Sequence, residues 1–408
     1  MDSFKSTIES AISAGKIPGA VTVASNATNS FTHTSSYGPQ SLQPTSSTPL
    51  KADAIFWIAS CTKLLTSISA LQCVERGQFT LDEDVSRILP ELKLEDLEIL
   101  QGFDSEGKPE LFKATKSITL RMLLTHTSGL AYDLFTPDLH RWRATRGEFA
   151  TLDKGTVLSR CKTPLMFEPG TSWAYSTGLD WAGLMISRAN NIKLEEYIHK
   201  YICAPLGITD LTFHIDQNPS LLSRLVDMTA RVGGMTQFGT TADPTGALVH
   251  SEEKVWSHEQ IDDAGGAGAF VSMSSYQKVL HSITISDEKL LSKAMNDKMF
   301  EGQLTEQQLA TLNYMRQMQD VRYLMSPTIS ANTKIDHGLG GLIVLEDLEG
   351  RRRKGSMCWT GLPNLIWWAD REAGVSGIYG SQLVPTADKQ TIEMFEEFEK
   401  AVYAEVGA

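Results

Sequence analysis

The sequence lacks any long uninterrupted run of apolar residues. No segment approaches the roughly 18 residues that a membrane-spanning helix needs, because Lys, Glu or Gly interrupts the most apolar stretches. A basic-then-apolar leader is also missing: Phe4, Ile8 and Ile12 recur at helical spacing and predict a surface helix at the start of the chain. We therefore expect a cytoplasmic protein without membrane association.

Cysteine is scarce and positive charge is in deficit. The 5 cysteines are scattered singly rather than in the close pairs of metal or redox motifs, so we expect reduced, buried thiols. A net charge of −12 argues against nucleic-acid binding, which calls for a basic face. We interpret two short basic runs, 141–146 and 351–354, as solvated faces. The alternative is that Arg141, Arg143 and Arg146 guide an acidic acyl carrier protein or a phosphopantetheine arm.

Motifs of several common enzyme classes are also missing. No Gly-x-Ser-x-Gly elbow is present, which removes the main alternative route to a serine hydrolase. No His-Glu-x-x-His is present either, and His258-Glu259 is an isolated pair. The stretch 265–268 lacks the Lys-Ser/Thr ending of a phosphate loop, and we interpret it as a flexible wall near the substrate. We expect no metal and no cofactor.

What the chain does contain is an ordinary globular composition, with 408 residues of which 41% are hydrophobic. Short β-prone runs lie near both ends, at 20–24, 31–37, 339–345, 353–359, 365–369 and 375–379. Helical periodicity dominates between them, at 118–125, 179–189, 194–202, 276–285 and 306–322, and returns at 386–403.

This order of elements predicts an α/β fold. We expect an antiparallel sheet flanked by helices and built from both chain ends, with an inserted, mainly helical subdomain. Residues 1–408 would form a single catalytic unit. Residues 1–78 and 330–408 would be its α/β subdomain, and residues 79–329 its helical one.

Ser60 and Lys63 are the candidates for nucleophilic catalysis. They are three residues apart at the start of an amphipathic helix with Leu64, Ile68 and Leu71 on one face, so both side chains point to the same side. A serine hydroxyl needs a neighbour that takes its proton, and an adjacent lysine can be that base or polarise another. The free N–H of Ser60 at the helix start can bind a developing oxyanion.

Two further segments offer partners for this pair. Tyr175 follows Pro169-Gly170 and precedes a helix, and a lysine ammonium beside its phenol would favour the phenolate, a general base for Ser60. The segment Trp359-Thr360-Gly361 ends a strand, and the N–H of Leu362 is our candidate for the second oxyanion donor. Taken alone, each segment is equally compatible with ordinary packing.

The ordered set of motifs resembles the class C β-lactamase and carboxylesterase superfamily. The set comprises Ser60-Cys61-Thr62-Lys63, Leu123-Leu124-Thr125-His126-Thr127-Ser128-Gly129-Leu130, Tyr175-Ser176-Thr177, Cys203-Ala204-Pro205-Leu206-Gly207 and Trp359-Thr360-Gly361. Within the superfamily the chain most resembles acyltransferases of the fungal lovastatin pathway and related carboxylesterases. The resemblance implies that Ser60 is acylated, Lys63 and Tyr175 handle protons, and the Ser60 and Leu362 amides form the oxyanion hole. It also implies that His126 braces a structural turn.

Two departures from the β-lactamase pattern concern the substrate. Those enzymes usually carry Asn and Lys where this chain has Thr177 and Trp359, and the loss of an amide and a fixed cation disfavours β-lactam binding. An apolar tryptophan suits a fatty or polyketide acyl group. We therefore expect Thr177, Gly266, Trp359, Thr360 and Gly361 to contact the substrate.

The leading hypothesis is acyl transfer from a thioester or ester to an alcohol through acyl-Ser60, in secondary polyketide metabolism. The donor would be a small molecule, a coenzyme A thioester or an acyl carrier protein. A carboxylester or thioester hydrolase is the first alternative, and a catalytically silent binding protein of the same fold is the second.

Overall fold

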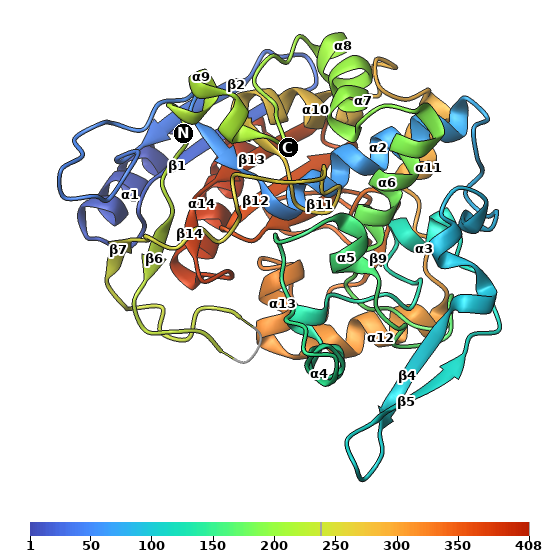
Figure 1. The fold of residues 1–408 in the computed structure, drawn as a ribbon. Coiled ribbons are helices and arrows are strands. Elements are labelled where there is room, and N and C mark those ends of the chain that lie inside the picture. The colour runs from blue at the N-terminus through green and yellow to red at the C-terminus, as the bar shows by residue number, and fades with distance from the viewer. Residues whose placement is uncertain (237–238, 408) are drawn as a thin grey trace.

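A seven-stranded antiparallel sheet forms the centre of the molecule (Figure 1). The computed structural model describes residues 1–236 and 239–407. Strand order in this sheet is β2-β1-β13-β12-β11-β10-β9. The strands are β1 (Ala20–Asn26), β2 (Thr32–Tyr37), β9 (Ile335–His337), β10 (Leu342–Val344), β11 (Met357–Gly361), β12 (Leu365–Asp370) and β13 (Val375–Gly380). The two chain ends meet where β1 pairs with β13, which confirms the predicted sheet.

Helices cover both faces of this sheet. The terminal helices α1 (Asp2–Ser13) and α14 (Lys389–Val406) pack together on one face, where the rings of Phe4 and Phe398 lie 5.3 Å apart. Helix α10 (Met273–Ile285) covers the other face, where Gln277 donates to the Ser376 hydroxyl of β13. Because side chains alternate along a strand, Ser376 faces α10, whereas Trp368, which pairs with the next residue Gly377, packs against Phe395 of α14.

The middle of the chain is mainly helical. Helix α2 (Thr62–Glu75) lies at its centre against α6 (Gly178–Asn190). Residues 62–73 of α2 are all buried, so the predicted amphipathic helix is in fact enclosed on every side. The other helices are α3 (Leu120–Leu124), α4 (Pro137–Thr145), α5 (Val157–Cys161), α7 (Leu194–Ile198), α8 (Ala204–Leu206), α9 (Pro219–Leu222), α11 (Lys293–Met299), α12 (Glu306–Gln317) and α13 (Gln319–Met325).

Small sheets interrupt the helical region where none was predicted. Strands β4 (Glu98–Phe103) and β5 (Pro109–Lys113) form a projecting hairpin (Figure 1). In its turn, Asp104 accepts the N–H groups of Glu106 and Lys108, and Gly107 adopts φ +81°. The remaining strands are β3 (Ile55–Trp57) with β8 (Phe270–Ser272), and β6 (Thr229–Arg231) with β7 (Leu248–His250) and β14 (Leu383–Val384). The subdomain boundaries after 78 and before 330 stay a prediction.

The cysteines and the helix lengths bear on two further expectations. All five cysteines are free and buried, as predicted. Among the described residues, no helix combines the length and the apolar character needed to cross a membrane.

Candidate active site

Ser60 lies in a single 3-10 turn, Ala59–Cys61, between β3 and α2. Ala59 adopts φ +44°, a conformation that L residues other than glycine rarely take. The turn is fixed from behind, because the buried Tyr276 hydroxyl donates to the Cys61 carbonyl at 2.8 Å. The Ser60 hydroxyl is thereby directed away from the core at the start of α2.

The Ser60 hydroxyl contacts both of its predicted partners. Tyr175 OH lies 2.6 Å from Ser60 Oγ, and Lys63 Nζ lies 3.3 Å from the same atom. Tyr175 reaches this position from the segment before α6, 115 residues along the chain. One hydroxyl is therefore held between a phenol and an ammonium group, an arrangement suited to moving its proton.

Lys63 is buried, and its three ammonium hydrogens each have an acceptor. These acceptors are Ser60 Oγ, the Tyr132 hydroxyl at 3.0 Å and the Gly266 carbonyl at 2.7 Å. Nζ also lies 4.7 Å from the centre of the Tyr175 ring. The cation thus acts on the face of the phenol rather than on its oxygen. Tyr132 was not predicted, because no regular spacing links it to Lys63.

An aromatic cluster holds Tyr175 in place. Its ring lies 4.9 Å from that of His126 and 5.6 Å from that of Trp359. His126 Nδ1 accepts the Ser176 N–H at 3.2 Å, and burial lowers the pKa of His126 well below its ordinary value. His126 is therefore neutral and braces the turn next to Tyr175, as predicted.

The oxyanion donors are placed by a turn and by the start of α2. The Leu362 amide lies in the turn between β11 and β12, and neither it nor the Ser60 amide donates to another described residue. Asn364, with φ +62°, holds this turn: its side chain donates to the Leu383 and Pro385 carbonyls and accepts the Asp388 N–H. Ser60 and Leu362 line the same cavity.

That cavity is mostly apolar. Its lining residues are Trp57, Ala59, Ser60, Tyr132, Asp133, Phe135, Thr151, Leu152, Arg160, Cys161, Tyr175, Thr177, Asp180, Trp256, Ala267 and Leu362. Thr177 is the one predicted substrate contact among them. Tryptophan does supply apolar wall here, but from Trp57 and Trp256, whose rings stack 5.4 Å apart.

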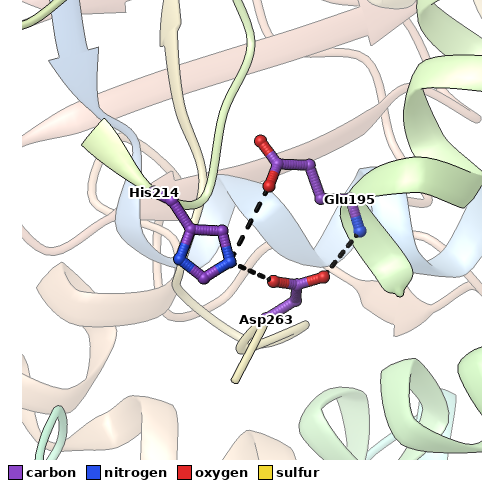
Figure 2. Close-up of side chains that lie close together, drawn as sticks. All are labelled: Glu195, His214 and Asp263. Carbon is purple, nitrogen blue, oxygen red and sulfur yellow. Dashed lines mark hydrogen bonds and ion pairs between the residues drawn. The ribbon is translucent and has the colours of Figure 1, made fainter. Parts of the chain in front are cut away.

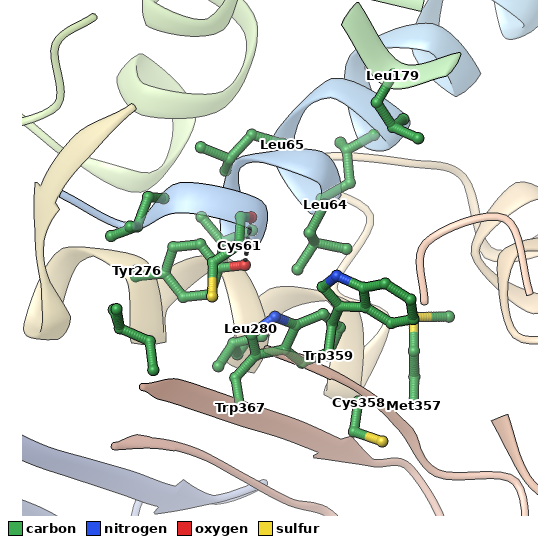
Figure 3. Close-up of a cluster of buried hydrophobic side chains, with 14 of the residues drawn as sticks. Cys61, Leu64, Leu65, Leu179, Tyr276, Leu280, Met357, Cys358, Trp359 and Trp367 are labelled. Carbon is green, nitrogen blue, oxygen red and sulfur yellow. Dashed lines mark hydrogen bonds between the residues drawn. The ribbon is translucent and has the colours of Figure 1, made fainter. Parts of the chain in front are cut away.

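The other predicted substrate contacts lie behind the described lining. Trp359 is 4% exposed and belongs to the core cluster beneath α2 (Figure 3). Thr360 Oγ1 donates to the Leu324 carbonyl, and a side chain at Gly361 would meet the Ile58 carbonyl at 2.6 Å. These residues position Tyr175 and Leu362 rather than lining the cavity.

Gly266 positions Lys63, while its neighbour Ala267 lines the cavity, so the stretch 265–268 does lie at the cavity wall. The Gly266 carbonyl accepts from Lys63, and the Gly266 N–H donates to Asp180 at 3.2 Å. A β-carbon there would lie 2.4 Å from Asp180 Oδ2 and 2.9 Å from the Tyr132 hydroxyl. Gly266 thus allows the backbone to approach both side chains closely.

The two basic runs are not simply solvated faces. Arg143 is buried, and its guanidinium contacts Asp133 at 2.8 Å and Glu148 at 2.9 Å. Arg352 is buried as well, against Glu399 at 2.6 Å. The sequence around these arginines does not indicate such ion pairs, because the carboxylate partners are distant along the chain or do not follow the three- or four-residue spacing of a helix.

Glu195, His214 and Asp263 gather outside the cavity (Figure 2). His214 Nε2 lies 2.8 Å from Asp263 Oδ1, and Asp263 Oδ2 accepts the Glu195 N–H at 2.8 Å. Glu195 Oε1 accepts from the Thr212 hydroxyl and the Phe213 N–H. These bonds join α7 to the segments before α9 and α10, so the cluster reads as a structural tether.

Comparison with known proteins places this geometry in a family. Residues 4–396 match the family model described as Beta-lactamase. The chain is 37% identical to monacolin J acid methylbutanoyltransferase of Aspergillus terreus, over 98% of this chain and 95% of that protein. It is 33% identical to lovastatin esterase of Penicillium rubens, over 98% of each.

Solved structures agree. A mutant of simvastatin synthase from Aspergillus terreus superposes with a TM-score of 0.89 at 37% identity, covering 99% of this chain and 94% of that one. The chain therefore belongs to the beta-lactamase family and, as its motifs predicted, resembles the fungal lovastatin-pathway acyltransferases within it.

Proposed function

We propose that the chain is a serine acyltransferase that moves an acyl group from a thioester or ester to an alcohol through acyl-Ser60. The observation that carries the proposal is the Ser60 hydroxyl held between Tyr175 and Lys63 at an apolar cavity. Relatives named as a methylbutanoyltransferase and as simvastatin synthase support acyl transfer. The acceptor would be a small hydroxylated molecule of polyketide metabolism.

In the first step, Tyr175 acts as the phenolate and takes the hydroxyl proton while Ser60 Oγ attacks the acyl carbonyl. The amides of Ser60 and Leu362 bind the oxyanion, and Lys63 stabilises the phenolate across the ring. Collapse of the tetrahedral intermediate breaks the bond to the leaving thiol or alcohol, which receives the proton from Tyr175. In the second step the acceptor hydroxyl gives its proton to Tyr175 and attacks acyl-Ser60. Ser60 then departs and recovers that proton.

The thiol carrier of the donor, coenzyme A or an acyl carrier protein, is part of the proposal. In the first basic run, Arg143 forms ion pairs with Asp133 and Glu148, whereas 53% of the Arg146 side chain is exposed. Reversing the charges of Arg141 and Arg146 should slow turnover of a carrier-bound donor at low salt. Unchanged turnover would leave only the free thioester as donor. We also propose a cytoplasmic enzyme, because five buried free thiols fit a reducing compartment.

Ester hydrolysis is the second candidate, and the likeness to lovastatin esterase favours it. The two differ in whether an alcohol or water takes the acyl group, which depends on how dry the cavity is kept. The test offers one acyl thioester with and without a panel of hydroxylated polyketides. Ester product formed at the expense of free acid supports transfer, and free acid released equally fast in every tube contradicts it.

Acylation itself is tested with a chromogenic short-chain ester. A mass increase on Ser60 that is absent in Ser60→Ala supports the acyl-enzyme. An unreactive Ser60 across esters and thioesters would instead favour a silent binding protein.

A further inference from the structure

Asp180 has a carboxylate oxygen that no group of the fold uses. The residue lies in the first turn of α6, is 5% exposed, and lines the active-site cavity together with Ser60 and Tyr175. Its Oδ1 accepts the Gly266 N–H at 3.2 Å. Its Oδ2 accepts no hydrogen bond from residues 1–236 or 239–407, and it retains accessible surface, unlike unpartnered core atoms such as Trp173 Nε1. Asp180 Oδ2 is therefore an acceptor that opens into the cavity.

Other buried carboxylates show how unusual this is. Asp133, Asp388 and Glu399 each pair with a buried arginine. Asp370 has no ion pair, but both of its oxygens accept hydrogen bonds from the protein. Asp180 forms no ion pair within the described part of the chain, and the N-terminus of α6 stabilises its charge without contacting Oδ2. A ligand that donates to this oxygen therefore satisfies a buried acceptor and gains binding energy.

The Gly266 peptide places Asp180 beside the groups that move protons. Its N–H donates to Asp180, and its carbonyl accepts from Lys63 at 2.7 Å. A β-carbon at Gly266 would lie 2.4 Å from Asp180 Oδ2 and 2.9 Å from the Tyr132 hydroxyl, so these two oxygens border the same small space. The Tyr132 ring lies 5.2 Å from that of Tyr175. Oδ2 thus lies on the side of the general base, where the acceptor must enter.

The charges around the cavity favour a neutral donor. Lys63 and Arg160 are two buried cations at the site. Asp133, also in the lining, is already neutralised by Arg143 at 2.8 Å. With Asp180 included, the remaining charges sum to one positive charge, which disfavours a further ammonium group. A hydroxyl donates a hydrogen bond to a carboxylate without adding charge.

We propose that Asp180 Oδ2 accepts a hydrogen bond from a second hydroxyl of the acyl acceptor, one that is not itself acylated. The inference rests on the acyl transfer proposed above. One hydroxyl of the acceptor gives its proton to Tyr175 and attacks acyl-Ser60, while the hydrogen bond of the other to Asp180 fixes the orientation of the molecule. Asp180 thereby determines both the preference for a polyol and the choice of the hydroxyl that reacts.

The experiment uses α,ω-alkanediols of increasing chain length and their monomethyl ethers, which lack the second donor. Acyl-Ser60 is first formed with a neutral chromogenic ester, and the ester product from each acceptor is then measured. Counted per reacting hydroxyl, the best diol should exceed its monomethyl ether by about 10- to 100-fold in kcat/KM, the effect of a hydrogen bond to a charged group. Equal rates would overturn the proposal, and so would a higher rate for the matching ω-ammonium alcohol.

An isosteric variant assigns the preference to Asp180. In Asp180→Asn the Gly266 N–H still requires an acceptor, so the amide oxygen takes the place of Oδ1 and the NH2 group faces the cavity. The variant therefore presents a donor where the wild type presents an acceptor, and the diol-to-ether ratio should fall to unity or below. Asp138→Asn, at an exposed aspartate in the first turn of α4, should keep the wild-type ratio. A diol preference that survives Asp180→Asn in a folded protein would contradict the assignment.

Two readouts keep the possible failures apart. If the neutral ester does not acylate wild-type Ser60, acyl transfer itself fails and this proposal fails with it. If acylation occurs without a diol preference, only the Asp180 proposal fails. Should Asp180→Asn not fold, the wild type is crystallised with the best diol. A diol hydroxyl within hydrogen-bond distance of Asp180 Oδ2 supports the proposal, and a diol bound with neither hydroxyl near this oxygen contradicts it.

Discussion

At the scale of single residues, the phenol of Tyr175 and the ammonium of Lys63 divide the work on Ser60. The three ammonium hydrogens of Lys63 donate to three acceptors that the fold holds in place, so Lys63 supplies a positive charge at a fixed position. Tyr175, 2.6 Å from Ser60 Oγ, is the group placed to exchange the proton. This division distinguishes the two residues experimentally.

Replacing Tyr175 by Phe should therefore slow acylation of Ser60 by about 10²- to 10⁴-fold, the usual contribution of a general base. The fold should survive, because the ring keeps its contacts with His126 and Trp359. The measurement is the burst of chromogenic alcohol from a short-chain ester, with the melting temperature as a control. A near-normal burst would return the base role to Lys63.

Replacing Tyr132 by Phe tests the anchoring of Lys63. The variant leaves one buried ammonium hydrogen of Lys63 without its acceptor. An unsatisfied buried donor of this kind costs about 1–3 kcal/mol of free energy. We expect acylation to fall by roughly 10-fold, much less than in Tyr175→Phe. Tyr314→Phe, at an exposed tyrosine, is the matched control. A loss as large as that of Tyr175→Phe would mean that Tyr132 itself carries the proton.

Sequence reasoning located the site where chemistry follows local spacing. Ser60 and Lys63 are recognisable because three residues of helix put their side chains on one side. Tyr175 is recognisable only through its motif. Tyr132 and Arg160 carry no such signal: each reaches the site through tertiary packing of separate segments. Trp359 was predicted to contact the substrate because the sequence of a strand does not show whether a tryptophan faces the substrate cavity or the hydrophobic core.

At the scale of elements, the turn between β11 and β12 sets the position of the Leu362 amide. Asn364→Ala removes three buried hydrogen bonds and a residue type that tolerates positive φ. We expect a loss of about 2–4 kcal/mol in unfolding free energy and slower acylation. Denaturant unfolding and the ester burst measure both, with the exposed Asn332→Ala as control. A stable variant with a normal burst would exclude this turn as a support of the oxyanion hole.

The tether at α7 predicts a pH dependence of stability. The hydrogen bond to Asp263 raises the pKa of His214 above its ordinary value. A raised folded-state pKa means that the stabilisation is fully present below the unfolded-state pKa, about 6.5, and is lost as pH rises through the folded-state value. The melting-temperature difference between wild type and His214→Gln should thus be larger near pH 6 than near pH 9.

The control for this experiment is His140→Gln, at an exposed histidine, which should give the same small difference at both pH values. If the melting-temperature difference between wild type and His214→Gln instead grew toward high pH, its pH dependence would have the opposite sign and would contradict the tether.

Elements with regular periodicity were predictable, and elements defined by packing were not. Strands β12 and β13 are β-prone runs bounded by turn residues, and their predicted and observed spans agree closely. The hairpin β4–β5 was missed even though Asp104 and Gly107 signal its turn, because charged and polar residues interrupt the apolar pattern of both strands. The helix predicted over 306–322 divides at Met318, where ψ is 119° and no residue type announces the break.

At the scale of the whole molecule, α14 locks the two chain ends onto one sheet, and the pair of Arg352 and Glu399 lies buried under it. Arg352→Met should cost up to about 3–5 kcal/mol of unfolding free energy, because it leaves the buried Glu399 with only the Arg351 guanidinium, 3.4 Å away, as a cationic partner. The double variant Arg352→Met/Glu399→Leu should recover much of that loss. Denaturant unfolding of the wild type, both single variants and the double variant measures the coupling, and additive losses would show that the pair is not a unit.

The origin of the residues around the cavity has a consequence for the history of the enzyme. Ser60 comes from the 3-10 turn before α2 and Lys63 from the first turn of α2, whereas Phe135, Thr151 and Leu152 come from connecting segments on the rim. Changes in the rim segments can alter which molecules enter without disturbing the groups that move protons. Enzymes that descend from one ancestor can therefore diverge in substrate specificity while the reaction that they catalyse stays the same.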